Sequence, residues 1–253
     1  MLSKNKIKYI QSLSRKKIRD TEKAFLVEGD KMVTEALESS LTVETLCATT
    51  DFLRANRRIV SGDTEVIEAT ADEIRKASLL QSPQNALAIV SMPEIGFDLG
   101  VLNDKLSLAL DFIQDPGNLG TIIRLADWFG IKHVICSENT VDCFNPKVIQ
   151  ASMGAIFRVQ MHYINLPAVL GEASQSGIPI FGAFLEGENI YKQPLSSSGI
   201  LVMGNEGNGI STEVGALVSD KVHIPSFAAE GSESLNVSMA TAICLSEFRR
   251  RQL

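Results

Sequence analysis

The chain has 253 residues, of which 45% are hydrophobic, a formal net charge of −6 at pH 7, and four cysteines. This length suits one large domain or two smaller ones, and the composition is typical of globular proteins that fold without disulfides. Cys47, Cys136, Cys143 and Cys244 form no CxxC pair, which favours buried thiols in a reducing compartment, so we expect a cytoplasmic protein. We expect neither a secretion signal nor a membrane span, since no apolar stretch approaches the ~20 residues that cross a bilayer.

The negative net charge hides a basic beginning of the chain. Residues 1–19 contain no acid and seven cations, which are Lys4, Lys6, Lys8, Arg15, Lys16, Lys17 and Arg19. Clustered cations attract phosphate backbones, so we expect this segment to bind nucleic acid, with Lys4, Lys6, Arg15, Lys16, Lys17 and Arg19 as RNA-binding residues. A solvated basic tail without a partner is the alternative.

The first half of the chain reads as short alternating elements. We expect strands at 24–27, 44–48 and 86–91 and helices at 30–38 and 71–78. A stretch that contains Pro93, Gly96 and Gly100 follows, and its composition is typical of a linker. The sequence therefore predicts a domain boundary within this stretch.

The second half alternates strands with helices more regularly. Residues 106–113 form a near-continuous apolar run, typical of a strand buried on both faces of a parallel sheet. We expect helices at 118–129 and 234–251 and further strands at 133–136, 179–184, 199–203 and 221–224. This alternation predicts an α/β domain with a parallel sheet, which binds ligands at the carboxyl ends of its strands.

Polar residues follow the first apolar run directly. Asp115-Pro116-Gly117-Asn118 predicts a turn, with Asn118 as the N-cap of the next helix. Arg124 projects from a different face of that helix than the apolar stripe, so it could reach a phosphate or a carboxylate at the strand ends. An ion pair with Asp127 on the helix surface is an equally open interpretation.

Two later segments also place small and polar residues after a strand. In Gly204-Asn-Glu206-Gly207-Asn-Gly209 the glycines allow close backbone approach to a ligand, but the pattern is neither GxGxxG nor a P-loop. A glycine-rich turn with an exposed Glu206 is the alternative. Between Ile224-Pro225 and Ser234 a loop of small residues could wrap an adenine, or Ser234 or its neighbour could simply cap the last helix.

We expect no metal site. His133, His162 and His223 lie far apart, without a metal-binding spacing, and no GxSxG nucleophile motif is present. The residues by themselves thus indicate an α/β domain with a ligand crevice and a basic N-terminal part, but no reaction.

Taken together, these segments resemble the motifs of the SpoU/TrmH branch of the SPOUT RNA methyltransferases. Asp115–Gly120 with 123–126 and 129–130 is similar to motif 1, Gly204–Gly207 to motif 2, and Ile224-Pro225 with Ser234–Val237 to motif 3. Residues 152–155 are similar to the small-residue segment between motifs 1 and 2. Residues 14–20 and 25–29 resemble the L30e-like substrate-binding domain that precedes the catalytic domain in many members. The resemblance covers nearly the whole chain.

The resemblance implies an α/β fold with an L30e-like RNA substrate-binding domain over 1–97 and a trefoil-knotted SPOUT catalytic domain with a parallel sheet over 98–253. It also implies a homodimer, with S-adenosylmethionine as cofactor and a ribose 2′-hydroxyl of RNA as methyl acceptor, rRNA being favoured over tRNA. The cofactor residues would be Gly204, Ile224 and Leu235, with Phe181, Gly182, Ala183, Gly207 and Pro225. Arg124 would face the target nucleotide across the dimer interface, with Asn118, Glu206, Ser234 and Asn236 shaping the site.

Two features depart from the family pattern, and both leave the contacts of the third motif open. The loop between Pro225 and Ser234 is longer than in many relatives, and Glu233 stands where a small or neutral residue is more usual. A catalytically silent RNA-binding or ribosome-assembly factor on the same fold is the main alternative. A nucleotide-dependent Rossmann enzyme is disfavoured, because the glycine-rich loop comes late in the domain.

Overall fold

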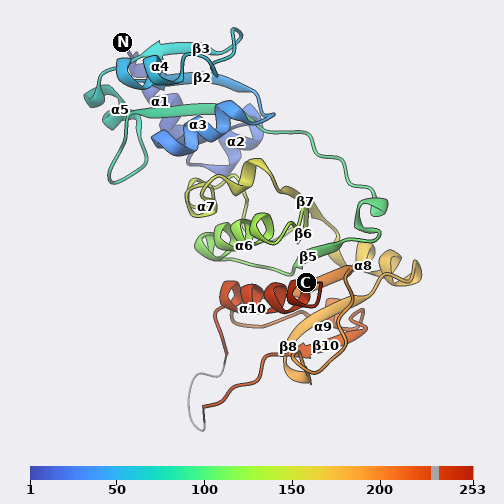
Figure 1. Cartoon of the computed structure of the whole chain (residues 1–253). Coiled ribbons are helices and arrows are strands. Elements are labelled where there is room, and N and C mark those ends of the chain that lie inside the picture. Colours follow the sequence, from blue (N-terminus) through green and yellow to red (C-terminus); the bar gives the residue numbers. More distant parts are fainter. Residues whose placement is uncertain (229–233, 253) are drawn as a thin grey trace. The chain divides into compact units, whose positions relative to one another are not determined.

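The computed structural model describes residues 1–228 and 234–252. The chain divides into two compact units, whose residues can be found in Figure 1 by the colour of their residue numbers. The first consists of Met1–Glu94 and Asp142–Arg158, and the second of Ile95–Val141 and Val159–Leu253. A segment from the second half of the sequence is therefore part of the first unit.

The first unit is built on a four-stranded sheet in the order β1-β4-β2-β3. Its strands are β1 (Ala24–Glu28), β2 (Val43–Ala48), β3 (Glu65–Glu68) and β4 (Ala86–Ser91), with β4 antiparallel to β1 and β2, and β3 parallel to β2. The helices are α1 (Lys4–Ser12), α2 (Lys16–Glu22), α3 (Asp30–Glu38), α4 (Thr50–Asn56), α5 (Ala71–Ala77) and α7 (Pro146–Ser152), with the 3-10 helix η2 (Ala155–Phe157). All five elements expected in this half are confirmed.

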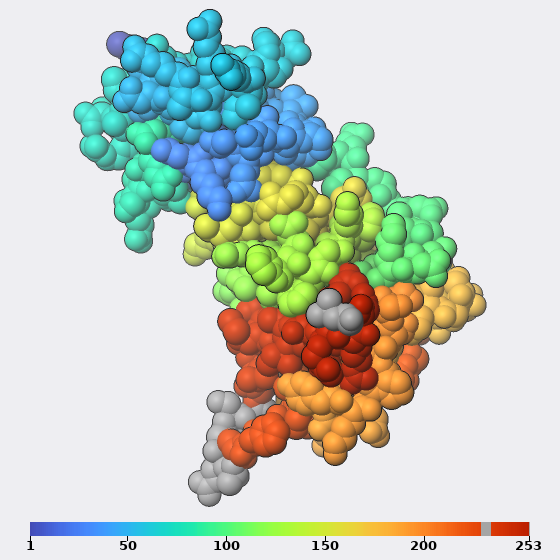
Figure 2. All heavy atoms as spheres, viewed as in Figure 1, coloured from blue at the N-terminus to red at the C-terminus, as the bar shows by residue number. Residues whose placement is uncertain are grey.

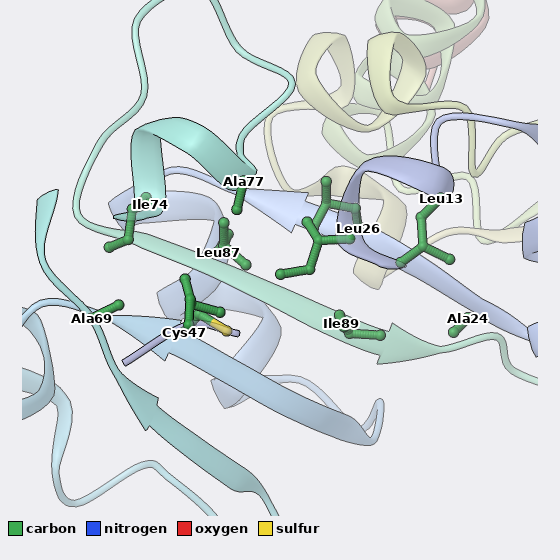
Figure 3. Close-up of a cluster of buried hydrophobic side chains, with 11 residues drawn as sticks. Leu13, Ala24, Leu26, Cys47, Ala69, Ile74, Ala77, Leu87 and Ile89 are labelled. Carbon is green, nitrogen blue, oxygen red and sulfur yellow. The ribbon is translucent and has the colours of Figure 1, made fainter. Parts of the chain in front are cut away.

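The basic N-terminal segment is not a tail. Ile10 of α1 and Leu13, which follows it, are fully buried in the core cluster that Figure 3 shows, where Leu26, Ile74 and Ile89 meet from β1, α5 and β4. Burying two such aliphatic side chains stabilises the unit by roughly 3–6 kcal/mol. The alternative of a solvated tail is therefore wrong, because the segment supplies part of the core.

Arg19 belongs to this interior as well, which corrects its assignment to RNA binding. Its side chain is 2% exposed, and its guanidinium donates to the Asp142 carboxylate at 2.5 Å. It also donates to the main-chain oxygens of Leu13 and Ser14 at 2.8 and 2.9 Å. A guanidinium that is buried and bonded in this way is unavailable to a phosphate.

The second unit holds a six-stranded sheet in the order β10-β8-β9-β5-β6-β7, and every neighbouring pair is parallel. The strands are β5 (Leu106–Leu110), β6 (His133–Ser137), β7 (Gln160–Ile164), β8 (Ile180–Asn189), β9 (Gly199–Met203) and β10 (Asp220–His223). The helices are η1 (Leu99–Leu102), α6 (Pro116–Trp128), α8 (Leu166–Gln175), α9 (Thr212–Gly215) and α10 (Val237–Arg250). The predicted parallel sheet is confirmed, and β5 and β9 at its centre are buried throughout.

Two helices begin at other residues than the sequence predicted. The carboxylate of Asp115 caps α6 by accepting from the Asn118 amide at 2.7 Å, and Pro116 takes the first helical position, where it needs no hydrogen bond. Asn236 caps α10 by accepting from the amides of Ser238 and Met239. Asn118 and Ser234 are thus not caps. Among the described residues, no helix is long and apolar enough to cross a membrane.

Candidate functional site

The carboxyl ends of β5 and β9 carry a rigid pair of turns. Asp111, which is 6% exposed, accepts a hydrogen bond from the Ser211 amide at 2.7 Å. Phe112 has a positive φ of 59°, rare for a residue with a side chain, and its amide donates to Ser137 Oγ at 2.8 Å. The neighbouring bonds hold this strained conformation, as is common where a backbone is shaped for function.

The glycine-rich segment closes into a small loop through Asn205. The Asn205 side chain donates to the Phe112 carbonyl at 2.8 Å and accepts from the amides of Gly207 and Asn208, both at 2.9 Å. Two main-chain bonds of 2.9 Å join Asn205 to Gly209. Asn205 thereby fixes the loop to the turn after β5.

The loop explains why residue 204 is glycine. A Cβ on Gly204 would lie 2.2 Å from Gly209 C and Ile210 N, which are backbone atoms of the same loop. Glycine is therefore required here by the loop itself, and not only by the approach of a ligand, because a side chain at residue 204 would displace the loop.

Glu206 joins this loop to the start of α6. Its carboxylate accepts from the amides of Gln114 and Asp115 at 3.3 and 3.2 Å and from Asn118 Nδ2 at 3.1 Å. Asn118 Oδ1 accepts in turn from Asn236 Nδ2 at 2.9 Å. The structure therefore brings together Asn118, Glu206 and Asn236, three predicted site residues from three distant segments. We call these three residues the polar cluster.

Arg124 lies outside the polar cluster. It is exposed and lines a hollow of about 720 Å³ between α6 and α10, together with Trp128, Tyr191 and Ile243. Figure 2 shows the green atoms of α6 beside the red atoms of α10 on one face. Its guanidinium forms no hydrogen bond or ion pair with any residue that the structure describes, so the alternative of a pair with Asp127 is wrong.

The residues expected to hold a cofactor are open to different degrees. Ile224 and Pro225 after β10 are partly exposed, and the Leu235 side chain is 52% exposed. Gly207 has space around it, since a Cβ there would meet nothing nearer than Asn205 Oδ1 at 3.6 Å. These positions leave main chain and apolar side chains available to a ligand.

Residues 181–183 can offer only their main chain. The Phe181 side chain is buried and packs edge-on against Phe248 with ring centroids 5.0 Å apart. A Cβ on Gly182 would lie 2.7 Å from Phe184 Cε2, and Ala183 is half-buried. The pairing of β8 with β10 is interrupted after Gly182 and resumes at Glu188, so β8 is irregular where the site was expected.

The remaining predicted residues contribute no described contact to the polar cluster. Ser234 is exposed, and Glu233 lies outside the described residues. In the first unit, Lys6 pairs with Glu65 at 2.6 Å and Lys16 with Asp20 at 3.1 Å, whereas Lys4, Arg15 and Lys17 are exposed. Within the described chain, no group of three or more His, Cys, Asp or Glu side chains could hold a metal ion.

Sequence reasoning missed three residues that build the site. Asp115 caps α6, Asn205 shapes the loop, and Asp111 anchors its far end. Asp-Pro is a frequent start of a helix, so the first could have been found from the sequence. No local pattern signals the other two, because their partners are distant in the chain.

Comparison with known families identifies the domain that carries the motif segments. The SpoU rRNA Methylase family matches residues 105–246, which include all three motif segments. The chain belongs to this family. The MRM3-like substrate binding domain matches residues 4–88, within the first unit. The resemblance of the sequence to SpoU/TrmH proteins is thereby confirmed.

Individual relatives of this SpoU family member cover nearly its whole length. The 23S rRNA (guanosine(2553)-2'-O)-methyltransferase RlmP of Bacillus subtilis is 31% identical over 253 residues, 96% of each chain. The structure of a TrmH-family protein from Porphyromonas gingivalis is 44% identical with a TM-score of 0.90, covering 99% of both chains. The SpoU methyltransferase AviRb from Streptomyces viridochromogenes, solved with AdoMet, is 26% identical with a TM-score of 0.86, covering 99% of this chain and 98% of its own.

Proposed function

We propose that this protein transfers a methyl group from S-adenosylmethionine to a ribose 2′-hydroxyl of RNA, with rRNA as the substrate. The observation that carries the proposal is the polar cluster, in which Asn118, Glu206 and Asn236 hold the three family motifs together at one edge of a parallel sheet. Ligands of open α/β sheets bind at this edge. The rRNA methyltransferase of Bacillus subtilis, similar over nearly the full chain, supports the choice of substrate.

The residues present fit S-adenosylmethionine. An adenosyl group needs apolar contacts and main-chain hydrogen bonds, and Ile224, Pro225 and Leu235 present partly exposed apolar side chains. Gly204 and Gly207 bring bare main chain to the same strand ends, and the main chain of Phe181, Gly182 and Ala183 is a further contributor. When bound, the cofactor supplies a methyl group carried on a positively charged sulfur.

The protein's own task is to align the ribose and to help its hydroxyl lose a proton as the oxygen gains the methyl carbon. Guanidinium groups stay protonated in proteins, so Arg124 is unsuited to act as a base. We assign it the role of lowering the pKa of the hydroxyl or clamping the neighbouring phosphate, while water or a phosphate oxygen takes the proton. The polar cluster keeps the motif loops in position, and we assign exposed Ser234 a part in shaping the site.

Arg124 and the polar cluster lie on different faces of α6, which supports a site completed by a second copy of the chain. The face between α6 and α10 presents the exposed side chains of Trp128 and Met239 beside the hollow of about 720 Å³. In a two-fold dimer the same surface of both copies meets, so the surface must be complementary to itself. The exposed Trp128 and Met239 side chains beside the hollow meet this condition, since the side chains of one copy can enter the hollow of the other. We therefore propose a homodimer through α6 and α10.

The N-terminal part would bind the RNA. We assign residues 1–97 to a substrate-binding domain and 98–253 to a knotted catalytic domain, with Lys4, Lys6, Arg15, Lys16 and Lys17 of α1 and α2 as RNA contacts. The match of the substrate binding domain to residues 4–88 supports this division. The four buried cysteines fit a reducing compartment, and we place the reaction in the cytoplasm.

The test is methyl transfer by the purified full-length chain from labelled S-adenosylmethionine to rRNA, followed by mapping of 2′-O-methyl sites. A substrate with a 2′-deoxyribose at the mapped nucleotide should accept no methyl group. Mapping RNA from cells with and without the protein identifies the natural position. Binding of cofactor and RNA without transfer would instead favour a catalytically silent assembly factor.

A further inference from the structure

Helix α4 and the turn after it carry a group of arginines that the site described above does not use. Arg54, Arg57 and Arg58 are all exposed, while Phe52 on the inner side of the helix is 6% exposed. Arg54 lies in the last turn of α4, Arg57 is its C-cap residue and Arg58 follows in the turn, so the three side chains come from five consecutive positions. We call these three residues the α4 arginines.

The α4 arginines have no acidic partner among the described residues, in contrast to six other cations of the first unit. Lys6, Lys16, Arg19, Lys31, Arg75 and Arg158 each form an ion pair with a carboxylate. None of the three α4 arginines forms an ion pair or a side-chain hydrogen bond with any described residue. Three like charges within five residues repel one another, which favours the binding of an external anion at this place.

Contacts with α3 hold the end of α4 in place. Asn56 Oδ1 accepts from Thr34 Oγ1 of α3 at 3.3 Å, and Asn56 Nδ2 donates to the Phe52 carbonyl at 3.0 Å. The Ile59 amide closes the following turn on the Asn56 carbonyl at 3.0 Å. The backbone that carries the arginines is therefore already ordered, which reduces the entropic cost of binding a ligand to them.

We propose that the α4 arginines form a phosphate-binding surface for the RNA substrate, in addition to the cations of α1 and α2. The inference rests on the proposed function and adds to it a surface of the protein that contacts the phosphates of the RNA. Arginine presents a planar fork that binds phosphate oxygens in pairs, which makes it better suited than lysine to this task. A solvated helix end explains one cation at the C-terminus of α4, but not three without partners.

The experiment compares two variants of the full-length chain with the wild type in binding a single-stranded 20-nucleotide RNA. One variant replaces the α4 arginines with glutamine. The control replaces Lys31, Arg75 and Lys76 with glutamine, which removes the same charge from exposed positions of the same unit. Melting temperature and S-adenosylmethionine affinity verify that both variants are folded.

Each cation that neutralises an RNA phosphate releases a counter-ion. The slope of log K against log salt therefore reports the number of neutralised phosphates, at about 0.7 for each contact with single-stranded nucleic acid. We expect the slope to become shallower by about 2 in the α4 variant and to stay nearly unchanged in the control. A second variant with lysine at the three positions should keep the slope. Equal slopes for the α4 variant and the wild type, or equal losses in both glutamine variants, would overturn the inference. A wild type that binds no RNA would count against the proposed function itself.

Discussion

The side-chain amides of Asn118 and Asn236 are joined by a hydrogen bond of 2.9 Å, although 118 residues separate them in the chain. Both side chains have a second task. Asn118 donates to Glu206, and Asn236 caps α10. Because the bond lies at the surface, its net contribution to stability is about 0.5–1.5 kcal/mol, and we attribute its main value to orienting the motif loops.

Replacing Asn118 should therefore affect catalysis more than stability. We expect Asn118→Ala to lose methyl transfer roughly 100-fold, because small displacements of positioning groups cost about that much, while the melting temperature changes little. Single-turnover transfer to RNA is the measurement. Asn236→Ser breaks the same hydrogen bond from the other side, since serine keeps the cap of α10 but loses the donor to Asn118. We expect it also to lose methyl transfer. Wild-type transfer by both variants would show that the polar cluster is only structural.

Replacing Arg124 should affect the methyl-transfer reaction but not the folding of the protein. Arg124→Ala should lose most methyl transfer with nearly unchanged S-adenosylmethionine affinity, and the free energy of unfolding should fall by at most about 1 kcal/mol, as for an exposed charge. Arg124→Lys should rescue the reaction poorly, because lysine lacks the planar fork. Rapid transfer by the alanine variant would remove Arg124 from the reaction.

The glycine loop can be tested by adding a single methyl group. Gly204→Ala forces a Cβ against the backbone of Gly209 and Ile210, and we expect a loss of about 1–3 kcal/mol in urea denaturation together with weaker cofactor binding. Gly207→Ala is the control, since its Cβ would meet only ordinary contacts. Equal unfolding free energies for Gly204→Ala and the wild type would contradict the geometry of this loop.

Glu247 predicts a dependence of stability on pH. Hydrogen bonds from Arg250 and then Arg251 hold the pKa of its carboxyl below the ordinary value. A carboxyl with a lowered folded-state pKa contributes stability above its unfolded pKa of about 4.3, and this contribution is lost as the pH falls through the folded-state pKa. Melting temperatures between about pH 6 and 3 should therefore fall less for Glu247→Gln than for the wild type. Parallel curves would exclude this contribution.

The proposed dimer depends on the apolar face of α6 and α10. Met239 is 56% exposed there, and Met239→Glu should shift the protein to a monomer by burying a charge without a partner. Leu185→Glu changes another exposed apolar residue, on β8 of the same unit, and should leave the mass unchanged. Light scattering at micromolar concentration distinguishes the two. A wild type that is monomeric and active would refute the dimer.

Many strands of the two sheets could be predicted from the sequence. The periodicity of hydrophobic residues and continuous apolar runs are signals that lie within each strand itself. Residues 106–113 and 199–203 read as buried parallel strands, and β5 and β9 lie there. Helices α1 and α2 were missed, since their many cations conceal the buried positions Ile10 and Leu13. Charge alone also misassigned Arg19.

The contacts that assemble the site could not be predicted from local patterns. The bonds of Glu206 to Asn118 and of Arg19 to Asp142 join residues 88 and 123 positions apart, and only the folded chain brings them together. The resemblance assigned Asn118, Glu206 and Asn236 to one site, and hydrogen bonds join their side chains in the structure. It gave no indication that Gly204 is constrained by its own loop.

Trp128 is the single tryptophan of the sequence, and its side chain is 83% exposed on the face between α6 and α10. Its indole is thus a fluorophore that reports on this one surface, without a label and without interference from other tryptophans. Anything that covers the face would move the indole from water into an apolar environment and shift its emission to shorter wavelength. The intrinsic emission of the unmodified protein, followed on dilution or during addition of RNA, would therefore report directly what happens beside Arg124.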